Sequence, residues 1–463
     1  MTKTHQKLCR TAHQIKPPSI RMWTMNRSKL TNQLAYEVVK TCRLCGSSDL
    51  VSSLRLRDTA FGDRYLPPGK GAANANLIPL EVVQCISCNG FQTSVVVDVE
   101  GMYEHYLSRP GAVNKILSGA YRQYAEHLNG LLDLSPEDLM VEIGSNDGLF
   151  ASLYAEKGIR CLGVDPAQNL TQVALERGVK TISTFFGSSV ANDIVAEHGN
   201  AKLIVANFMV ANVSDLDNFM KGVKTLLASD GIYAMETNYV LDVVDNMQLE
   251  VINHEHITYF SVVSLSTFLG KHGLEIFRAQ RVPSKSGSLR CYIQHKGSNF
   301  EIESSVADAK RCEIDYGVFL PSVWKPMEHA IEHVRSAAGK YFETKTTEGI
   351  AGYGSSIGAT TLIYSLEIGQ YLKALIDDDP YRQGLESPGF AIPTVSKVNI
   401  FSEPLKTKHC VVLAPRYASQ IIANNRAAHE SGVTFSRIWP VLEEIPYKAW
   451  RGETETKSFE IPV

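Results

Sequence analysis

The stretch LMVEIGSNDGLFASLYAEKG, residues 139–158, decides the fold because it holds a strand, a glycine turn and a helix in succession. Its opening apolar run, LMVEI, is typical of a buried parallel strand, and the apolar spacing from Leu149 onward is helical. The glycines of GSNDG let the backbone turn tightly and approach a ligand closely. The next segment, GIRCLGVDP, predicts a second strand that ends at Asp165, 21 residues after Gly144.

The same alternation continues toward the C-terminus. AKLIVANFMVANV predicts a strand with a turn at Asn207, and DGIYAMETNYV predicts another strand that ends at Glu236. EGIAGYGSSIGATTL repeats the order of strand, glycine turn and helix, and LKALIDDDP then predicts a strand that ends at Asp377. Strands that alternate with helices form parallel sheets, which bind ligands at the carboxyl ends of their strands. The sequence therefore predicts an α/β protein with two Rossmann-like units.

Acidic residues around the first turn indicate which ligand it binds. Glu142, Asp147 and Asp165 would repel the pyrophosphate of a dinucleotide, but they suit S-adenosylmethionine (SAM), which carries a sulfonium, an ammonium and no phosphate. An acid at the end of the second strand can also accept both ribose hydroxyls. An aromatic side chain in STFFG is placed to stack on adenine. The residues expected to bind SAM are Glu142, Gly144, Asn146, Asp147, Gly148, Asp165, Phe186 and Asn207.

Two C-x-x-C pairs predict a metal site. The pairs are Cys42 with Cys45 and Cys85 with Cys88, and the other five of the nine cysteines are scattered singly. Four thiolates from two tight turns complete a tetrahedral zinc site and leave no open position for water, so this zinc would be structural. An odd cysteine total with paired C-x-x-C motifs favours a reducing compartment over a disulfide framework, so we expect a cytoplasmic protein.

Length and composition place the chain among ordinary multidomain globular proteins. It has 463 residues, 44% of them hydrophobic, and a formal net charge of −3, which gives no reason to expect nucleic acid as a partner. No apolar run is long enough to predict a membrane span. Residues 1–35 contain several basic residues before Glu37, and we interpret them as a disordered tail or an upstream start before Met25; a transit peptide is the alternative.

The expected domain boundaries follow from these patterns. We place a tail at 1–35, a zinc-binding lobe at 36–100 and a SAM-dependent methyltransferase domain at 101–298. A helical connecting segment covers 299–345, a C-terminal Rossmann-like lobe covers 346–446, and a tail covers 447–463.

Several segments in a fixed order resemble one known family, the zinc-containing, SAM-dependent C-methyltransferases that act on nucleotide-linked keto-deoxysugars. The resemblance extends from about residue 42 to about residue 440, and its carriers are CRLCG, CISCNGFQ, VEIGSNDG, GVDPAQN, ETNYVLD, HEHITYFS, GSLR, GYGSSIGATTL and DDDPYRQGLESPG. It implies a zinc-binding lobe, a central Rossmann-like class I methyltransferase domain and a C-terminal lobe that helps hold the sugar nucleotide. The usual substrate of such enzymes is a deoxythymidine-diphosphate 4-keto-hexose, methylated on the carbon beside the ketone.

The resemblance also implies a catalytic role for the HEH segment. The glutamate and histidine of this loop lie in the active site of such enzymes, and they correspond here to Glu255 and His256. An imidazole with an ordinary pKa near ~6.5 can remove the proton beside a ketone, so His256 is the expected base, and the resulting enolate then attacks the methyl group. Glu255 would orient His256 or hold a sugar hydroxyl. Tyr106, in YEHYLS, would hydrogen-bond the substrate or the enolate oxygen.

The chain departs from the family pattern on its acceptor side. Asn253 stands where a tyrosine is common, Asn212 where a histidine is common, and Asn238 where a proline is usual, while SKSGSLR replaces the usual H-G-G-S before L-R. The donor side is intact. We therefore expect the methyl donor to be kept and the acceptor to differ from the common 4-keto-hexose. Candidate acceptor-binding residues are Asn253, Lys285, which would contact a phosphate or polarise a carbonyl, and Arg290, which would bind an anion with two hydrogen bonds.

The second glycine turn leaves two other functions open. G-Y-G-S-S-I-G-A is a fair dinucleotide fingerprint, so an NAD(P)-dependent oxidoreductase is one alternative. The resemblance instead assigns this turn to the sugar nucleotide, which Tyr353, Ser355 and Asp377 would contact. A catalytically inactive paralogue that binds a sugar nucleotide is the other alternative. The acceptor, the site and stereochemistry of methylation, attack by carbon or by oxygen, and the oligomeric state do not follow from the sequence.

Overall fold

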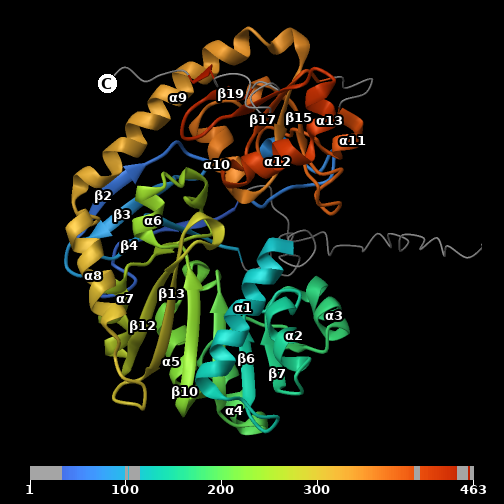
Figure 1. Cartoon of the computed structure of the whole chain (residues 1–463). Helices are drawn as coiled ribbons and strands as arrows, with labels where there is room; N and C mark the ends of the chain where they lie inside the picture. Colours follow the sequence, from blue (N-terminus) through green and yellow to red (C-terminus); the bar gives the residue numbers. More distant parts are fainter. Residues whose placement is uncertain (1–33, 100–102, 104–114, 401–406, 446–456, 459–463) are drawn as a thin grey trace, which may run out of the picture. The chain divides into compact units, whose positions relative to one another are not determined.

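The glycine turn at 144–148 connects a strand of a seven-stranded sheet to the helix that follows it in the computed structural model, which describes residues 34–99, 103, 115–400, 407–445 and 457–458 (Figure 1). The strand order is β12-β13-β10-β9-β6-β7-β8. Five of these strands are parallel, β13 is antiparallel to β10, and β12 is antiparallel to β13. Their bounds are β6 Leu139–Ile143, β7 Arg160–Val164, β8 Lys180–Ile182, β9 Ala201–Asn207, β10 Leu227–Thr237, β12 Leu274–Val282 and β13 Ser288–His295.

Both faces of this sheet are covered by helices because alternate residues of each strand point to opposite sides. On β6, Met140 belongs to a core with α1 and α2, while Val141 belongs to a second core with α4, α5 and α7. None of the helices within the described residues is long and apolar enough to cross a membrane. The helix bounds are α1 Lys115–Leu132, α2 Leu149–Ala155, α3 Gln168–Glu176, α4 Ser188–His198, α5 Leu216–Leu226, α6 Val240–Asp245 and α7 Val262–Lys271.

The N-terminal cysteine-containing segment forms its own antiparallel sheet with the order β11-β4-β3-β2. Three of its strands come from that segment: β2 Leu50–Arg55, β3 Glu81–Cys85 and β4 Phe91–Thr93. The fourth, β11 Thr258–Tyr259, lies just after the HEH segment. The N-terminal sheet therefore includes the chain that follows the expected catalytic loop. A separate pair joins β1 Tyr36–Val38 to β5 Val95–Val97.

The C-terminal part contains a second, mainly parallel seven-stranded sheet with the order β16-β15-β14-β17-β18-β19-β20. Its strands are β14 Ile350–Tyr353, β15 Leu372–Ile376, β16 Thr394–Val395, β17 His409–Val412, β18 Thr434–Arg437, β19 Glu443–Ile445 and β20 Lys457–Ser458. Its helices are α10 Ile357–Ser365, α11 Lys397–Ile400, α12 Ala418–Asn424 and α13 Arg426–Glu430.

Two helices stand where the sequence predicts one connecting helix. Helix α8, Ser304–Tyr316, ends at Gly317, whose φ of 77° suits glycine at a helix C-terminus. A short 3-10 turn that begins at Pro321 follows, and α9 then runs from Lys325 to Glu343. Because the sequence pattern is helical on both sides of this break, the sequence predicted one continuous helix.

A buried ion pair joins the N-terminal segment to the C-terminal sheet. Arg382 NH2 lies 2.8 Å from Asp63 Oδ1, and both side chains are more than nine-tenths buried. Arg382 NH1 also donates to the carbonyl of Ser355 at 2.8 Å. Burial raises the pKa of Asp63, and the neighbouring guanidinium opposes that shift. Loss of the arginine would leave the carboxyl group buried without a counter-charge.

Replacing Arg382 by methionine is expected to lower the free energy of unfolding by about 3–5 kcal/mol, because the Asp63 carboxylate loses its partner. The matched control is Arg57→Met, which removes a pair with Glu367 whose two side chains are 56% and 40% exposed and which is expected to cost about 0–1 kcal/mol. Urea unfolding of the two variants measures both. A cost for Arg382→Met no larger than that of the control would contradict the prediction.

Candidate methyltransferase site

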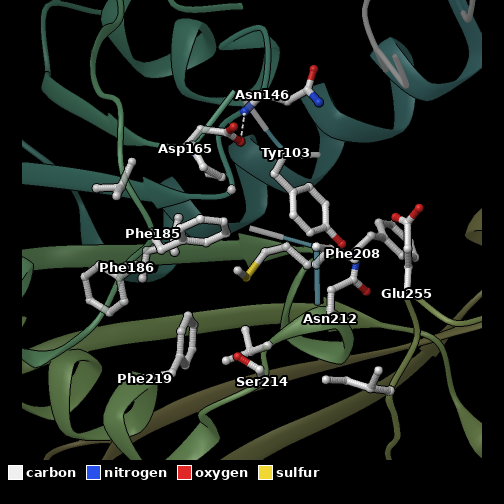
Figure 2. Close-up of a pocket in the computed structure, with 18 of the residues that line it drawn as sticks. Tyr103, Asn146, Asp165, Phe185, Phe186, Phe208, Asn212, Ser214, Phe219 and Glu255 are labelled. Carbon is white, nitrogen blue, oxygen red and sulfur yellow. Dashed lines mark hydrogen bonds between the residues drawn. The ribbon is translucent and has the colours of Figure 1, made fainter. Parts of the chain in front are cut away.

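A cavity of about 790 Å³ opens at the carboxyl ends of β6, β7 and β9, where ligands bind to sheets of this kind (Figure 2). Its wall combines the turns after these strands with the loop before β11 and with part of the N-terminal segment. The wall includes Tyr103, Tyr121, Glu142, Asn146, Asp147, Asp165, Phe185, Phe186, Asn207, Phe208, Asn212, Phe219, His254, Glu255 and Lys285.

Three residues of the glycine turn have positive φ: Gly144, Asn146 and Gly148. Gly144 has a φ of 73°, and a Cβ placed there would lie 2.6 Å from Met209 Cγ. Gly148 also has a φ of 73°, and its Cβ would lie 3.0 Å from that of Ala174. Gly144 lies in the cavity wall, while Gly148 lies outside it and starts α2. Of the two predicted glycines, one borders the ligand space and the other closes the turn behind it.

The three predicted acids all line the cavity, but their carboxyl groups have different partners. Asp165 Oδ2 accepts a hydrogen bond from Asn146 N at 2.8 Å, and Oδ1 accepts one from Ala167 N at 2.8 Å. Glu142 accepts from Ala151 N at 3.0 Å, and burial raises its pKa well above the ordinary value. Asp147 lies 3.3 Å from Arg177 NH2. Asp165 is thus fixed at the turn with carboxylate lone pairs still able to accept ribose hydroxyls.

Aromatic rings form one side of the cavity. Phe186, predicted to stack on adenine, packs edge-on against Phe219 with ring centres 5.4 Å apart. Its neighbour Phe185 is half exposed and meets Tyr103 edge-on at 6.1 Å. Figure 2 shows Phe185 and Phe186 on the wall between the Asn146–Asp165 pair and Phe219. Both rings of this dipeptide line the cavity, so either one is placed where the predicted stacking on adenine could occur.

Two asparagines in the cavity wall carry buried polar atoms that make no hydrogen bond to the described residues. Asn207, at the end of β9, has both Nδ2 and Oδ1 in this state and is 9% exposed. Asn212 has Oδ1 in the same state. Buried amides without partners are costly, so these atoms are ready to bind a polar ligand. Asn207 was predicted as a cofactor residue; Asn212 was noted only as a departure from the family.

The loop that carries the HEH segment is held by its own asparagine. Asn253 Oδ1 accepts hydrogen bonds from Glu255 N at 3.0 Å and from His256 N at 3.1 Å. At its end, Ile257 O accepts from Thr93 N at 3.1 Å, beside the β4–β11 pairing. Glu255 and His254 line the cavity. Asn253, predicted to touch the substrate, instead shapes the loop and lies outside the cavity wall.

His256 lies behind this loop and outside the cavity wall. Its Nδ1 lies 2.6 Å from the carbonyl of Val251, which only accepts, so Nδ1 carries the proton. Asn238 Nδ2 then donates to Nε2 at 3.3 Å. Burial lowers the pKa of His256 to about 4. The imidazole is therefore neutral, and both of its nitrogens are hydrogen-bonded within the protein. The predicted base thus lies apart from the cavity.

Lys285 and Arg290, both predicted to bind the acceptor, lie in different surroundings. Lys285 lines the cavity, and its Nζ lies 3.5 Å from the centre of the Phe208 ring. Arg290 lies outside the cavity wall and donates from Nε and NH2 to Glu236 Oε2 at 2.9 and 2.7 Å. Its guanidinium also covers the Tyr124 ring. Anion binding by Arg290 would require this buried pair to open, so the structure favours a structural role for it.

The predicted sugar-nucleotide residues of the C-terminal sheet lie outside this cavity. Asp377 Oδ2 accepts from Ser355 N at 2.9 Å and from Ser355 Oγ at 2.7 Å. Tyr353 donates to Asp378 at 3.0 Å. The second glycine turn is thus closed on its own acid, much as the first is closed on Asp165.

The four paired cysteines converge as predicted. Their Sγ atoms all lie within 4.8 Å of one another, with Cys42–Cys88 and Cys45–Cys85 separations of 3.5 Å. Leu44 N and Ser47 N point to the sulfurs of the first pair, at 3.4 and 3.5 Å. Four thiolates at this spacing fit a structural zinc ion.

Some residues of the cavity wall were not predicted from the sequence, and one predicted residue lies outside the described residues. Tyr106 lies outside the described residues, while Tyr103, three positions before it in the same YEHYLS segment, lines the cavity. Phe185 and Phe208 were also missed. The doubled phenylalanine in STFFG was a usable signal for Phe185, while nothing in the sequence distinguishes Phe208 from a core residue.

Three protein-family models match successive parts of the sequence. Residues 42–103 match the family described as "Putative zinc binding domain", residues 117–279 a "Methyltransferase domain", and residues 283–440 a "C-methyltransferase C-terminal domain". The C-methyltransferase NovU of Streptomyces niveus is 29% identical over 419 residues, which cover 88% of this chain and 96% of NovU.

Solved methyltransferases are similar over a smaller part of the chain. The magnesium protoporphyrin IX methyltransferase of Synechocystis PCC 6803, solved with bound S-adenosylhomocysteine (SAH), is 13% identical and covers 40% of this chain and 89% of its own, with a TM-score of 0.31. The CcbJ methyltransferase of Streptomyces caelestis is 12% identical, with coverages of 43% and 96% and a TM-score of 0.31. Scores this low add nothing to the assignment, which rests on the domain models and NovU.

Three observations indicate the same kind of enzyme, a methyltransferase with a zinc-binding domain: the order of the matched domains, the four-cysteine cluster and the acidic glycine turn at the end of β6. The cofactors of the chain are SAM and a structural zinc ion. The chain is a SAM-dependent methyltransferase, and its three matched domains and its similarity to NovU fit the zinc-containing C-methyltransferase family.

Proposed function

We propose that the chain methylates a carbon beside the ketone of a nucleotide-activated keto-deoxysugar, by way of an enolate. One observation carries this proposal: a single cavity holds the Asn146–Asp165 turn and also Glu255 and Lys285. Figure 2 shows Asn146 and Asp165 at one side of the cavity and Phe208, Asn212 and Glu255 at another. A donor site and a carboxylate that can take a proton therefore border the same space.

Bound SAM supplies an electrophilic methyl group on its sulfonium. Asp165 is fixed by two backbone donors and is proposed to accept the ribose hydroxyls. Phe185 or Phe186 is proposed to stack on adenine. Asn207, whose amide has no partner in the described residues, is proposed to bind the polar end of the donor or the acceptor. The cavity walls then fix the methyl group close to the acceptor carbon, and such positioning contributes much of the rate.

We propose Glu255 as the group that removes the proton beside the ketone. It lines the cavity, is 5% exposed and is oriented by the Asn253 hydrogen bond to its backbone N–H. His256, which the sequence predicted as the base, has both ring nitrogens engaged behind the loop and is proposed to position it. A carboxylate serves as a general base when it reaches the proton, and geometry decides between the two candidates before basicity does.

The nucleotide sugar is proposed from the resemblance of the whole chain and from its C-terminal domain. The amides of Asn207 and Asn212 offer donors and acceptors suited to sugar hydroxyls. The two C-x-x-C pairs and the odd cysteine total are typical of a reducing compartment, so a cytoplasmic location is proposed.

The test incubates the full chain with SAM and a panel of keto-deoxysugar nucleotides, among them dTDP-4-keto-6-deoxyglucose and 3-keto isomers, and follows products by mass spectrometry. Product heavier by one methyl group, with the new carbon on the ring as shown by NMR, supports the proposal. Because the acceptor side departs from the family pattern, we expect an acceptor other than the common 4-keto-hexose to react fastest. Methylation on oxygen, or no methylation of any member while NADH is oxidised, would contradict the proposal.

Replacing Asp165 by asparagine is expected to weaken SAH binding by about 10- to 100-fold, since a hydrogen bond to a charged group contributes about 1.5–3 kcal/mol. Asp377→Asn is a matched control, because Asp377 closes the second glycine turn in the same manner. Calorimetric titration with SAH measures both variants. Equal losses in the two variants, or a loss only in Asp377→Asn, would contradict binding at the first turn.

A further inference from the structure

The cavity wall holds seven carboxylic residues and one lysine among its described residues. Lys285 is the only lysine or arginine among the described residues that line it. The carboxylic residues of the same wall are Glu37, Asp98, Glu142, Asp147, Asp165, Asp215 and Glu255. Binding of a sulfonium and an ammonium is favoured by the acids and opposed by the lysine. Lys285 therefore needs an explanation other than binding of the methyl donor.

The backbone that presents Lys285 is strained and firmly held. Lys285 has φ 50° and ψ 35°, and Ser286 and Gly287 follow with φ values of 68° and 124°. Ser286 O accepts from Asn246 Nδ2 at 3.1 Å and from Gln248 Nε2 at 2.7 Å. Consecutive residues with positive φ persist only where the surroundings impose them, and such strain is concentrated at functional sites.

Two further contacts fix this turn from outside. Arg416, from the C-terminal part, donates to the carbonyl of Lys285 at 3.1 Å and is itself held by Glu250 at 3.1 Å. Ser284 Oγ donates to Glu236. The turn is therefore held on both sides of Lys285 by groups that do not enter the cavity, which leaves the lysine side chain as the part that does.

The ammonium itself lies over an aromatic ring. Lys285 Nζ is 3.5 Å from the centre of the Phe208 ring, and Phe208 also has a positive φ, 54°. Phe208 directly follows Asn207, and both lie in the cavity wall with Glu255. A ring face attracts a cation without accepting a strong hydrogen bond, so the N–H groups of Lys285 stay available to a ligand oxygen.

We propose that Lys285 is a catalytic residue whose ammonium donates a hydrogen bond to the ketone oxygen of the acceptor and stabilises the enolate oxygen formed from it. This role rests on the proposed function. The C–H bond beside the ketone breaks, its proton passes to the Glu255 carboxylate, and its electron pair forms the C–C double bond as negative charge moves to the oxygen. The enolate carbon then bonds to the methyl group as the sulfur–methyl bond breaks, the ketone re-forms, and neutral SAH leaves. Lys285 keeps its proton throughout.

The protonation of Lys285 gives this role a pH signature. Burial, and then the nearby Arg416, lower its pKa to about 8, while Glu236 acts in the opposite direction. The other ionisable groups around the turn are Asp242, whose carboxyl lies against Gly287, and Glu250, Glu255 and His256, and the pKa of His256 is itself lowered in part by Lys285. The active form is the ammonium, which is present below this pKa and lost above it. Accordingly kcat/KM should fall as the pH rises through about 8.

The test compares Lys285→Met and Lys285→Arg with the wild type on the acceptor that the wild type methylates. All three side chains are unbranched at Cβ, so the backbone strain at this position is nearly the same. Lys296→Met, at an exposed lysine, is the matched control. We expect Lys285→Met to lose about 100- to 1,000-fold in kcat, as when one oxyanion donor is removed, with SAH affinity unchanged. Lys285→Arg, a permanent cation, should keep most of the rate and lose the fall above pH 8.

Each other result overturns a defined part of the proposal. Wild-type protein that methylates no keto-sugar nucleotide overturns the proposed function, and the role of Lys285 with it. Wild-type activity with Lys285→Met within threefold of it overturns the role of Lys285 alone. An inactive Lys285→Arg together with a wild-type kcat/KM that rises through pH 8 also overturns it, because the neutral amine would then be the active form.

Discussion

Replacing Glu255 by glutamine is expected to lower kcat for methyl transfer by about 100- to 10,000-fold, the range that a positioned proton acceptor contributes. The amide has nearly the volume of the carboxylate and can keep its place in the cavity wall, but it cannot accept the proton beside the ketone. Because Glu255 lies in the wall on the side away from the Asn146–Asp165 turn, SAH affinity should stay within about threefold of the wild type.

The matched variant is His256→Asn, which removes the ring behind the same loop. If His256 only positions the loop, kcat should fall far less than in Glu255→Gln. Exchange of the acceptor C–H with deuterated solvent, measured with SAH in place of SAM, reports proton removal alone. Exchange that survives in Glu255→Gln and vanishes in His256→Asn would contradict our assignment and restore the histidine as the base, as the sequence predicted.

Replacing Cys85 by serine is expected to remove the bound zinc and essentially all methyl transfer. Structural zinc contributes about 10–16 kcal/mol to the folding of small zinc domains, and a hydroxyl is a poor replacement for a thiolate. Cys85 ends β3, which pairs with β4, and β4 pairs with β11 directly after Glu255 and His256. Loss of the zinc-bound turns therefore removes the support of the catalytic loop as well as the N-terminal sheet.

Cys312→Ser is the control, since Cys312 is an exposed free thiol outside the cluster. Metal analysis should give one zinc per chain for the wild type and for this control, and much less for Cys85→Ser. Thermal unfolding and methyl transfer should change only in Cys85→Ser. A Cys85→Ser protein that keeps one zinc and wild-type activity would show that the four-cysteine cluster does not hold the metal.

The fold was predictable from the sequence where its signals are local. The apolar strand before GSNDG, the positive-φ glycines and the acid at the end of β7 all follow from residues within a short stretch, and so do the cysteine pairs. The pairing of β11 with β4 was not predictable. A strand of two residues is too short to show the alternation of apolar and polar residues, and its partner lies far away in the sequence. The break between α8 and α9 was hidden by helical patterns on both sides.

The site was predictable on the donor side and much less so on the acceptor side. Asp165 and the turn are set by strand order, which the sequence reveals. Whether Glu255 or His256 of this irregular loop reaches the cavity depends on hydrogen bonds that the loop donates to Asn253 Oδ1 and to the carbonyl of Val251. A periodic sequence pattern does not reveal such bonds. Arg290 had the chemistry of an anion site, but its partner Glu236 comes from a neighbouring strand and is visible only in the register of β10 with β13.

Calorimetric titration of the full chain with SAH, and separately with NADH, tests the central claim most directly, namely that the acidic glycine turn after β6 binds the methyl donor. We predict one SAH site per chain and no binding of NADH. Binding of NADH without binding of SAH would contradict the account and favour a nicotinamide-dependent enzyme.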